Sequence, residues 1–556
     1  MDELTRMANA VLQPGFDGLT PPDWLRRSLA DGLGGVLLWD RNVAGPAQLA
    51  ELTRALRAEN PAVLVAIDEE GGDVTRLESR TGSSWPGNAA LGVADDVELT
   101  RAVATEIGRD LAAAGINLNY APVADVNVNP NNPVIGVRSF GADPGRVAAH
   151  TAAFVTGLQS QGVAACAKHF PGHGGTTVDS HVGLPVLDDD AGDLAAALTP
   201  FRAAIDAGVR AVMSAHILLP AIDGVPATLS RRLLTGVLRE ELGYAGLVIT
   251  DAIEMAAIKK TYGLEEGAVR AIAAGADAVC IGGWRDAEAV VARLRDAIAA
   301  AVRTGRLDEQ RLAEAAARTL QVAAWAFGAR DDDTTRTARD NGDTTRTARD
   351  DDDTTRTARD DDDMTRTARD NGDTMIKAGN DTTTRAGHDG ETTPKADDGD
   401  TTIWAGDRTI GLIAARRALR ITGALRPLPA APHVIELSPA VNAQIGPDTR
   451  WGLTAALARE LPATTGLRCA EPPGDPAALA AAAAGRPLVI AVRDAHRHPW
   501  IAAALGALLA ARPDATVVEM GLPHGEPPPC AAYVATYGAA AVCALAAAEA
   551  LTGTDR

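Results

Sequence analysis

Short apolar runs alternate with helical stretches along the first 328 residues, and this alternation constrains the fold more than any other feature. The apolar residues in each run are consecutive, as in strands buried on both faces of a parallel sheet. The runs cover residues 36–39, 63–67, 117–122, 165–169, 211–215, 247–250 and 278–281, and one near Val11 supplies an eighth. Repeated βα units predict a (β/α)8 barrel of the TIM type or a doubly wound sheet, and eight strands favour the barrel. We therefore expect residues 1–328 to form one α/β barrel domain.

A ten-residue repeat of the type ARDDDDTTRT follows this region. It holds almost no large apolar side chains, so it cannot bury a core, and residues 329–407 are predicted to be an acidic, disordered linker. The residue spacing of a calcium-binding loop is absent, which favours a solvated linker over a calcium-binding repeat. Apolar runs return at 434–437, 488–492, 516–520 and 534–537. Residues 408–556 are therefore predicted to form a smaller α/β domain.

The charge distribution limits which classes of partner are expected, and the cysteine pattern indicates the cellular compartment. The formal net charge is −20, and residues 331–400 alone carry 21 acidic and 11 basic side chains, a net of −10. Because no basic stripe is present, neither nucleic acid nor an anionic membrane is an expected partner. The five cysteines form no CxxC pair, which fits a reducing compartment. Without a signal-peptide pattern or an apolar run of about 18 residues, we expect a cytoplasmic protein.

The densest group of reactive side chains lies between residues 167 and 185, directly after a predicted strand. Active sites of parallel barrels form in the loops that follow the strands. His169 and His173 are four residues apart, as in helical zinc motifs. Proline and glycine residues between and beside them oppose a helix, and no Glu lies between them, so a metal site is not favoured. For His173, hydrogen bonding within the loop is the preferred interpretation.

Asp179 and His181 in the same loop have a spacing suited to acid–base chemistry. A carboxylate two residues before a histidine can accept a hydrogen bond from one ring nitrogen, which fixes the tautomer and raises the basicity of the other nitrogen. Such an imidazole can protonate a leaving group and later remove a proton from water. The spacing alone is only a moderate indication.

A second site is predicted where the run 247–250 ends at Asp251. A carboxylate at the carboxyl end of a barrel strand points into the mouth, where glycosidases place a nucleophile. The alternative is that Asp251 caps the helix that follows it. Judged from this residue alone, the helix cap is the better interpretation. Glu254 is a weaker rival for the nucleophile.

These stretches resemble glycoside hydrolase family 3, and within it the bacterial β-N-acetylglucosaminidases. The resemblance spans residues from about 5 to 325 and rests on IDEEGGDVTRL, NLNYAPVADVNVNP, VIGVRSFGADP, KHFPGHG with DSH, VMSAHILLPAID and VITDAIEM. It implies Asp251 as nucleophile, His181 as acid/base and Asp179 as the partner that orients His181. It also implies a set of residues that bind the sugar: Asp68, Arg76, Arg138, Lys168, His169, His216 and Met255.

The function expected from this resemblance is a retaining exo-β-N-acetylglucosaminidase that acts on muropeptides or chito-oligosaccharides without a cofactor or metal. A phosphorylase, a non-catalytic sugar-binding regulator and a zinc-dependent hydrolase on the same barrel are the alternatives. The C-terminal region resembles, more weakly, the α/β sandwich domain that follows the barrel in many family members. Its stretch 493–500 contains His496 and His498. We favour a surface or packing role for this stretch over contact with the barrel.

Overall fold

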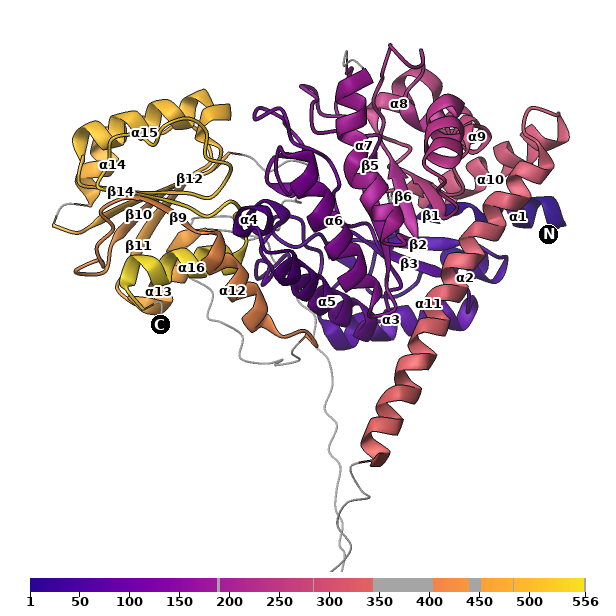
Figure 1. Ribbon diagram of the computed structural model, residues 1–556, viewed down its shortest axis with the longest axis horizontal. Helices are drawn as coiled ribbons and strands as arrows, with labels where there is room; N and C mark the ends of the chain where they lie inside the picture. Colours follow the sequence, from indigo (N-terminus) through magenta and orange to yellow (C-terminus); the bar gives the residue numbers. More distant parts are fainter. Residues whose placement is uncertain (188–190, 284, 344–403, 440–451, 484, 555–556) are drawn as a thin grey trace, which may run out of the picture. The chain divides into compact units, whose positions relative to one another are not determined.

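A computed structural model of the chain describes residues 1–187, 191–283, 285–343, 404–439, 452–483 and 485–554 (Figure 1). Met1–Asp332 and Thr402–Arg556 form one compact unit. Most of the predicted linker, residues 344–403, lies outside the described residues. Among the described helices, none combines the length and the apolar character needed to cross a bilayer.

The N-terminal part is an eight-stranded parallel barrel, as predicted. Strands β2 to β7 pair in chain order, β1 pairs with β8, and single bridges Gly15–Leu37 and Ile249–Ala278 link the two groups into a closed ring. The strands are β1 (Leu12–Pro14), β2 (Gly35–Leu38), β3 (Leu64–Ile67), β4 (Leu118–Asn119), β5 (Ala164–Phe170), β6 (Ala211–Ser214), β7 (Leu247–Thr250) and β8 (Val279–Ile281).

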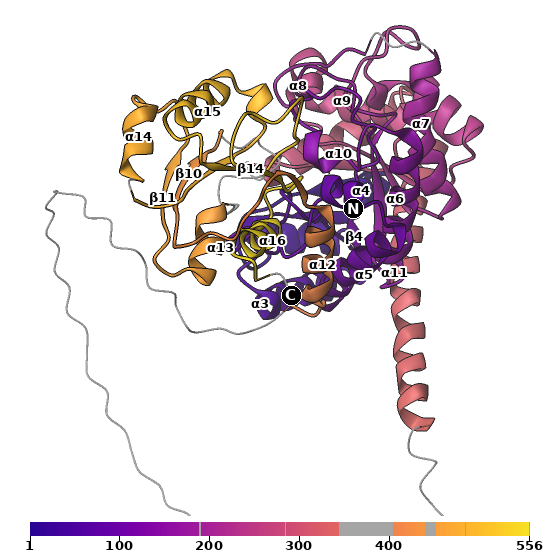
Figure 2. The same ribbon diagram turned by 60° about the vertical axis from the view of Figure 1, so that its left-hand side comes forward.

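Helices surround this barrel, with α3, α5, α6 and α7 outside the strands in Figures 1 and 2. They are α1 (Glu3–Ala10), α2 (Asp23–Ala30), α3 (Pro46–Glu59), α4 (Asn88–Ala94), α5 (Val97–Ala113), α6 (Pro144–Gln159), α7 (Ala191–Asp206), α8 (Ala256–Tyr262), α9 (Leu264–Ala274), α10 (Ala287–Arg303) and α11 (Glu309–Asp343). Short helical turns are η1 (Asp40–Asn42), η2 (Gly136–Arg138) and η3 (Ala227–Leu229), and η4 (Arg232–Glu241) is a π-helix. Helix α11 thus ends inside the region predicted as linker.

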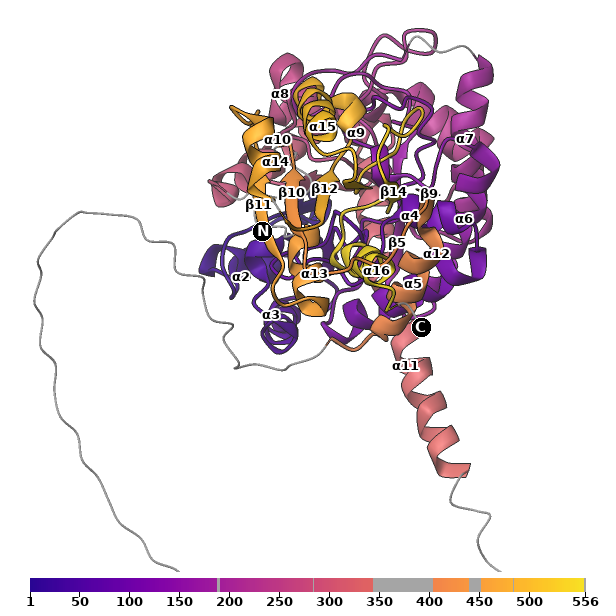
Figure 3. The same ribbon diagram turned by 90° about the vertical axis from the view of Figure 1, so that its left-hand side faces the viewer.

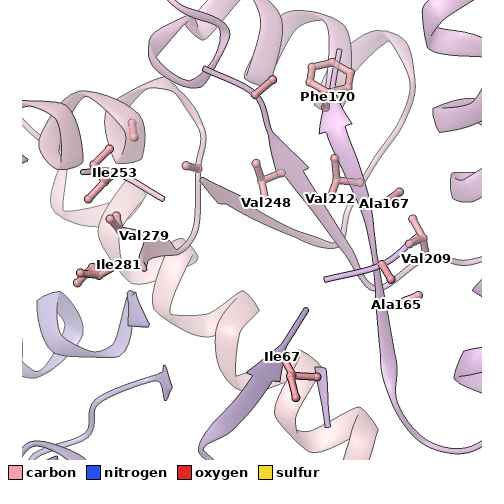
Figure 4. Close-up of a cluster of buried hydrophobic side chains, with 14 of the residues drawn as sticks. Ile67, Ala165, Ala167, Phe170, Val209, Val212, Val248, Ile253, Val279 and Ile281 are labelled. Carbon is pink, nitrogen blue, oxygen red and sulfur yellow. The ribbon is translucent and has the colours of Figure 1, made fainter. Parts of the chain in front are cut away.

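The strands are buried on both faces because alternate side chains enter two different clusters. One cluster fills the barrel interior and includes Leu64, Leu118 and Ile249. The other packs against the helices, and Figure 4 shows members of it such as Val212 and Val248. Because each strand is buried on both faces, its sequence consists mainly of consecutive apolar residues and does not alternate between apolar and polar residues.

The C-terminal part is a six-stranded sheet in the order β11-β10-β12-β13-β14-β9, in which only β9 is antiparallel. Helices α14 and α15 cover one face, and α13 and α16 cover the other (Figures 1 and 3). Its strands are β9 (Arg420–Gly423), β10 (His433–Leu437), β11 (Thr465–Cys469), β12 (Leu488–Val492), β13 (Thr516–Glu519) and β14 (Ala532–Ala535). Its helices are α12 (Arg408–Ala418), α13 (Leu453–Glu460), α14 (Pro476–Ala482), η5 (Ala495–Arg497), α15 (Pro499–Ala511) and α16 (Ala541–Thr552).

A buried group of charges lies at the end of the barrel opposite the carboxyl ends of its strands. Asp277, just before β8, is fully buried and accepts hydrogen bonds from the guanidinium groups of Arg239 and Arg311, and from Arg318 at 3.0 Å. Its carboxylate also accepts the backbone N–H of Val248 at 2.9 Å. A single carboxylate therefore joins η4 and α11 to the strands β7 and β8.

We expect Asp277→Asn to destabilise the barrel by about 3 kcal/mol, because it leaves three guanidinium groups beside a neutral amide. Denaturant unfolding of the full chain measures this loss. Glu288→Gln is the matched control, since Glu288 pairs with Arg27 on the exposed surface. That change should cost less than about 1 kcal/mol. Equal losses for the two variants would contradict the structural role assigned to Asp277.

Candidate active site

The carboxyl ends of the barrel strands bring most of the predicted residues to one mouth. Lys168 and His169 lie on β5, Asp68 follows β3, His216 follows β6 and Asp251 follows β7. All the barrel strands are parallel, so these positions share one end of the barrel. The clustering that the sequence predicted for these five residues is therefore present.

A network of buried charges crosses the mouth and joins the loops after β3 and β4 to strand β5. The Lys168 ammonium lies 2.7 Å from Asp68 and 2.6 Å from Glu70. Arg138 donates two hydrogen bonds to Glu70, at 2.9 and 2.8 Å. Burial alone raises the pKa of Glu70, but the adjacent Arg138 and Lys168 outweigh it and hold that pKa well below its usual range. Glu70 is therefore a carboxylate that orients two predicted sugar-binding cations.

Sequence reasoning selected Asp68 from the run Asp68-Glu69-Glu70 and missed the other two carboxyls. Glu69 accepts the backbone N–H groups of Arg76 and Leu77 at 2.8 and 3.0 Å, and burial raises its pKa to about 7. Three acidic residues directly after a buried strand were the available signal. Burying them together requires partners, which the loop after β4 and strand β5 supply for Glu70.

Arg76 is 1% exposed, and its guanidinium lies over the Trp39 ring, 4.9 Å from the ring centre. The arginine thus belongs to the packed wall of the mouth near the end of β2. Its assignment as a sugar-binding residue stays a prediction.

The His169 ring is oriented by Asp125, a buried residue that sequence reasoning did not select. His169 Nδ1 lies 2.7 Å from Asp125 Oδ2, while Asp125 Oδ1 accepts the backbone N–H groups of His169 and His173 at 3.2 and 2.7 Å. Burial raises the pKa of Asp125, but His169 outweighs it and the net pKa is lowered. An ionised Asp125 places the ring proton on Nδ1, which leaves Nε2 as the accepting nitrogen of a neutral ring. Among the described residues, no three His, Cys, Asp or Glu side chains gather as metal ligands do.

His216 and Met255 are both buried, and the charge of His216 acts on Asp251. His216 Nε2 lies 3.0 Å from the carbonyl oxygen of Ala252, which only accepts, so Nε2 carries the proton. His216 Nδ1 lies 2.8 Å from the Thr228 hydroxyl. Both ring nitrogens therefore have hydrogen-bond partners, and His216 holds the segment after β7 through the carbonyl oxygen of Ala252. Met255 is 6% exposed and precedes α8.

Asp251 follows β7 directly and accepts the backbone N–H of Ala252 at 2.7 Å. Burial raises its pKa, but His169, His216 and His181 outweigh burial, so the net pKa lies below the usual value. Helix α8 has Met255 at its N-cap. The alternative that Asp251 caps the following helix is therefore wrong, and its carboxylate is available for chemistry.

The predicted pair Asp179–His181 is formed. Asp179 Oδ1 accepts the backbone N–H of His181 at 2.9 Å and lies 2.6 Å from its Nδ1. Burial lowers the pKa of His181, but the hydrogen bond that His181 donates to Asp179 and the charge of Asp251 outweigh burial and raise the pKa above its usual value. His181 and Asp251 therefore act on each other electrostatically in the same mouth.

Glu254, the rival nucleophile, lies in a different environment. One carboxyl oxygen accepts the backbone N–H of Gly283, and the other has no hydrogen-bond partner among the described residues. Burial raises the pKa of this carboxyl. A carboxyl that holds its proton more readily is a poorer nucleophile than Asp251.

The stretch 493–500 contacts the barrel, although a surface or packing role was favoured from the sequence. Arg493 pairs with Asp73, whose carboxylate also accepts the backbone N–H of Ala539 at 2.9 Å. His496 Nε2 lies 3.0 Å from the carbonyl oxygen of Pro130. These contacts reach the loops after β3 and β4, which carry Glu70 and Arg138.

Known proteins are similar to this chain in both sequence and fold. Residues 22–322 match the model of the Glycosyl hydrolase family 3 N terminal domain. Beta-hexosaminidase A of Pseudoalteromonas piscicida is 36% identical over 333 residues, which cover 54% of this chain and 55% of that protein. A beta-hexosaminidase of Thiobacillus denitrificans is 40% identical over 261 residues, covering 45% of this chain and 72% of that protein.

A solved structure extends the similarity to the C-terminal part. It is a glycoside hydrolase family 3 beta-N-acetylglucosaminidase from Paenibacillus sp. strain FPU-7, with 31% identity and a TM-score of 0.78, covering 100% of this chain and 97% of that one. The chain spans about half the length of the Pseudoalteromonas relative. Because the family model matches more than half of its residues, and the barrel mouth has the residues described above, this chain belongs to glycosyl hydrolase family 3.

Proposed function

We propose that the protein is a retaining exo-β-N-acetylglucosaminidase, with Asp251 as nucleophile and His181 as acid/base. The observation that carries the proposal is that Asp251, directly after β7, and the hydrogen-bonded pair Asp179–His181, in the loop after β5, lie at the same end of the barrel. The pKa of Asp251 lies below its usual value and that of His181 above it. Near neutral pH the carboxylate is therefore ionised, and the imidazole keeps a proton more readily than an isolated histidine does.

In the first step, Asp251 attacks the anomeric carbon while His181 donates a proton to the leaving oxygen. This step forms a covalent glycosyl-enzyme with the configuration inverted once. In the second step, His181 removes a proton from water, which attacks the same carbon and releases Asp251. Two inversions retain the configuration of the sugar. Asp179 supports both steps because it keeps Nδ1 protonated and stabilises the imidazolium.

The sugar ring is proposed to lie over the charged network of the mouth. Asp68 accepts hydrogen bonds from sugar hydroxyls, and Lys168, Arg138 and the Nε2 atom of His169 complete the binding edge. Glu70 and Asp125 hold three of these groups in place before the substrate arrives. A preformed network of this kind binds without a large reorganisation cost.

The natural substrate and compartment belong to the same proposal. N-Acetylglucosamine-terminated muropeptides or chito-oligosaccharides fit the beta-hexosaminidase and beta-N-acetylglucosaminidase names of the relatives. All five cysteines are free, which fits a reducing, cytoplasmic location. Hydrolysis is preferred to phosphorolysis because those relatives are named as hydrolases.

Asp251→Ala should lower kcat/KM for an aryl N-acetylglucosaminide by more than about 1,000-fold, because no carboxylate remains to form the covalent intermediate. Glu254→Gln is the comparison variant and should retain most of the activity. Assays with and without phosphate, with the released sugar identified, report the acceptor in the same experiment. Near-normal turnover by Asp251→Ala, or loss of turnover only in Glu254→Gln, would refute the assignment.

The alkaline limb of the pH profile of kcat/KM should follow the loss of the His181 proton. Asp179 raises the pKa of His181. Removing that charge with Asp179→Asn should therefore move the alkaline limb to lower pH, while the acid limb set by Asp251 stays in place. The control is Asp95→Asn, which removes a carboxylate 3.6 Å from another histidine, His150 on α6. An unchanged alkaline limb in Asp179→Asn would contradict the role of the pair.

A further inference from the structure

His173 is buried inside the loop that carries Asp179 and His181. It is 2% exposed, and both of its ring nitrogens face hydroxyl groups of the same loop. Nδ1 lies 2.7 Å from Thr176 Oγ1, and Nε2 lies 3.1 Å from Ser180 Oγ. Its backbone N–H also donates to Asp125 at 2.7 Å. One side chain therefore connects the start of the loop to Ser180, the residue between the members of the catalytic pair.

A second loop completes this connection. The Asn132 amide donates to the carbonyl oxygen of His173 at 2.9 Å and to the Thr176 hydroxyl at 3.3 Å. Its side-chain oxygen accepts the backbone N–H groups of Val134 and Ile135 at 3.0 and 2.8 Å. These residues lie just before Arg138 in the loop after β4. The loop with the acid/base and the loop with a predicted sugar-binding arginine therefore share one hydrogen-bonded support.

The two hydroxyl partners suit a neutral imidazole. A neutral ring donates from one nitrogen and accepts at the other, and a hydroxyl can complement either role. Burial lowers the pKa of His173 to about 4. The His173 ring therefore stays neutral across the pH range in which His181 exchanges its proton. Its hydrogen bonds to Thr176 and Ser180 do not change while His181 donates and accepts protons.

Apolar packing contributes little to holding the catalytic pair. Val178 and Val182, on either side of it, are 42% and 67% exposed. Ser180 between them is 2% exposed, and its hydroxyl reaches His173. The polar contact to His173 is therefore the main described link between Ser180 and the interior of the barrel mouth.

We propose that His173 is a positioning residue for the acid/base: through the hydroxyl of Ser180 it sets where His181 stands relative to the glycosidic oxygen. The inference rests on the proposed function, because it needs His181 to be the acid. His173 does not contact the reacting atoms in this assignment. Its loss should weaken proton donation to the leaving group without removing the nucleophile or the sugar-binding network.

The test uses Ser180→Ala, His173→Asn and His173→Gln in the full chain, each assayed on aryl N-acetylglucosaminides that differ in the leaving phenol. The parameter is kcat/KM, which reports the steps up to the first bond cleavage. Phenol is a poor leaving group and needs a proton from His181, whereas 2,4-dinitrophenol departs without one. Asparagine reaches only the Nδ1 position of histidine, while glutamine reaches the Nε2 position and can still bond to Ser180.

Ser180→Ala and His173→Asn should lower kcat/KM for the phenyl substrate by about 10- to 100-fold, since small displacements of a catalytic group cost this much. They should leave the dinitrophenyl substrate within about threefold of the wild type. His173→Gln should recover part of the loss. The double variant His173→Asn/Ser180→Ala should lose no more than the worse single variant, because both changes break the same contact.

His150→Gln is the matched control. His150 is also a buried histidine bonded to a hydroxyl, with Nδ1 at 2.8 Å from Thr100 Oγ1, but it lies on α6 outside the mouth. The dependence of kcat/KM on the leaving group in His150→Gln should equal that of the wild type. If His173→Asn fails to fold, Ser180→Ala still tests the proposal, because it removes only one hydroxyl.

An equal loss on all leaving groups, or no loss, would overturn the positioning role of His173. His181→Ala separates this result from a failure of the proposed function. If His181→Ala is selective for poor leaving groups and the His173 and Ser180 variants are not, only the present inference fails. If His181→Ala shows no selectivity, the acid/base assignment fails first.

Discussion

Two buried cations in the barrel mouth, Lys168 and Arg138, are stable there because Glu70 and Asp68 neutralise them. Unpaired charges at such depth would cost several kcal/mol each. Asp68 and Glu70 lie in the loop after β3, Arg138 lies in the loop after β4 and Lys168 lies on β5, so their pairing also fixes two loops relative to this strand. The shape of the proposed sugar-binding edge is therefore a consequence of charge neutralisation among buried side chains.

The proposed chemistry follows from placing two titratable groups, Asp251 and His181, in different surroundings at the same mouth. Asp251 meets histidines and a backbone N–H, which favour its ionised form. His181 meets carboxylates, which favour its protonated form. The barrel supplies this contrast because strands that are distant in sequence end at one edge. The proposed acid and the proposed nucleophile therefore each favour the protonation state that the reaction needs.

The sequence predicted the barrel well because its strands are apolar on both faces, and the run 247–250 coincides with β7. The edge strands β9 and β11 were missed because their side chains are mostly exposed and show no apolar run. Among site residues, Glu70 and Asp125 escaped detection because each acts through another side chain. Their partners lie 68 and 44 residues away in the chain, and only the fold brings them together. Asp251 could not be separated from a helix cap until the start of α8 was known.

The most direct test of the account is to find where the sugar is held during turnover. A slow 5-fluoro analogue of N-acetylglucosaminyl fluoride, followed by proteolysis and mass spectrometry, measures the site of attachment. The account predicts one N-acetylglucosaminyl-type adduct on the carboxylate of Asp251. An adduct on Glu254, or complete turnover without any covalent adduct, would contradict it.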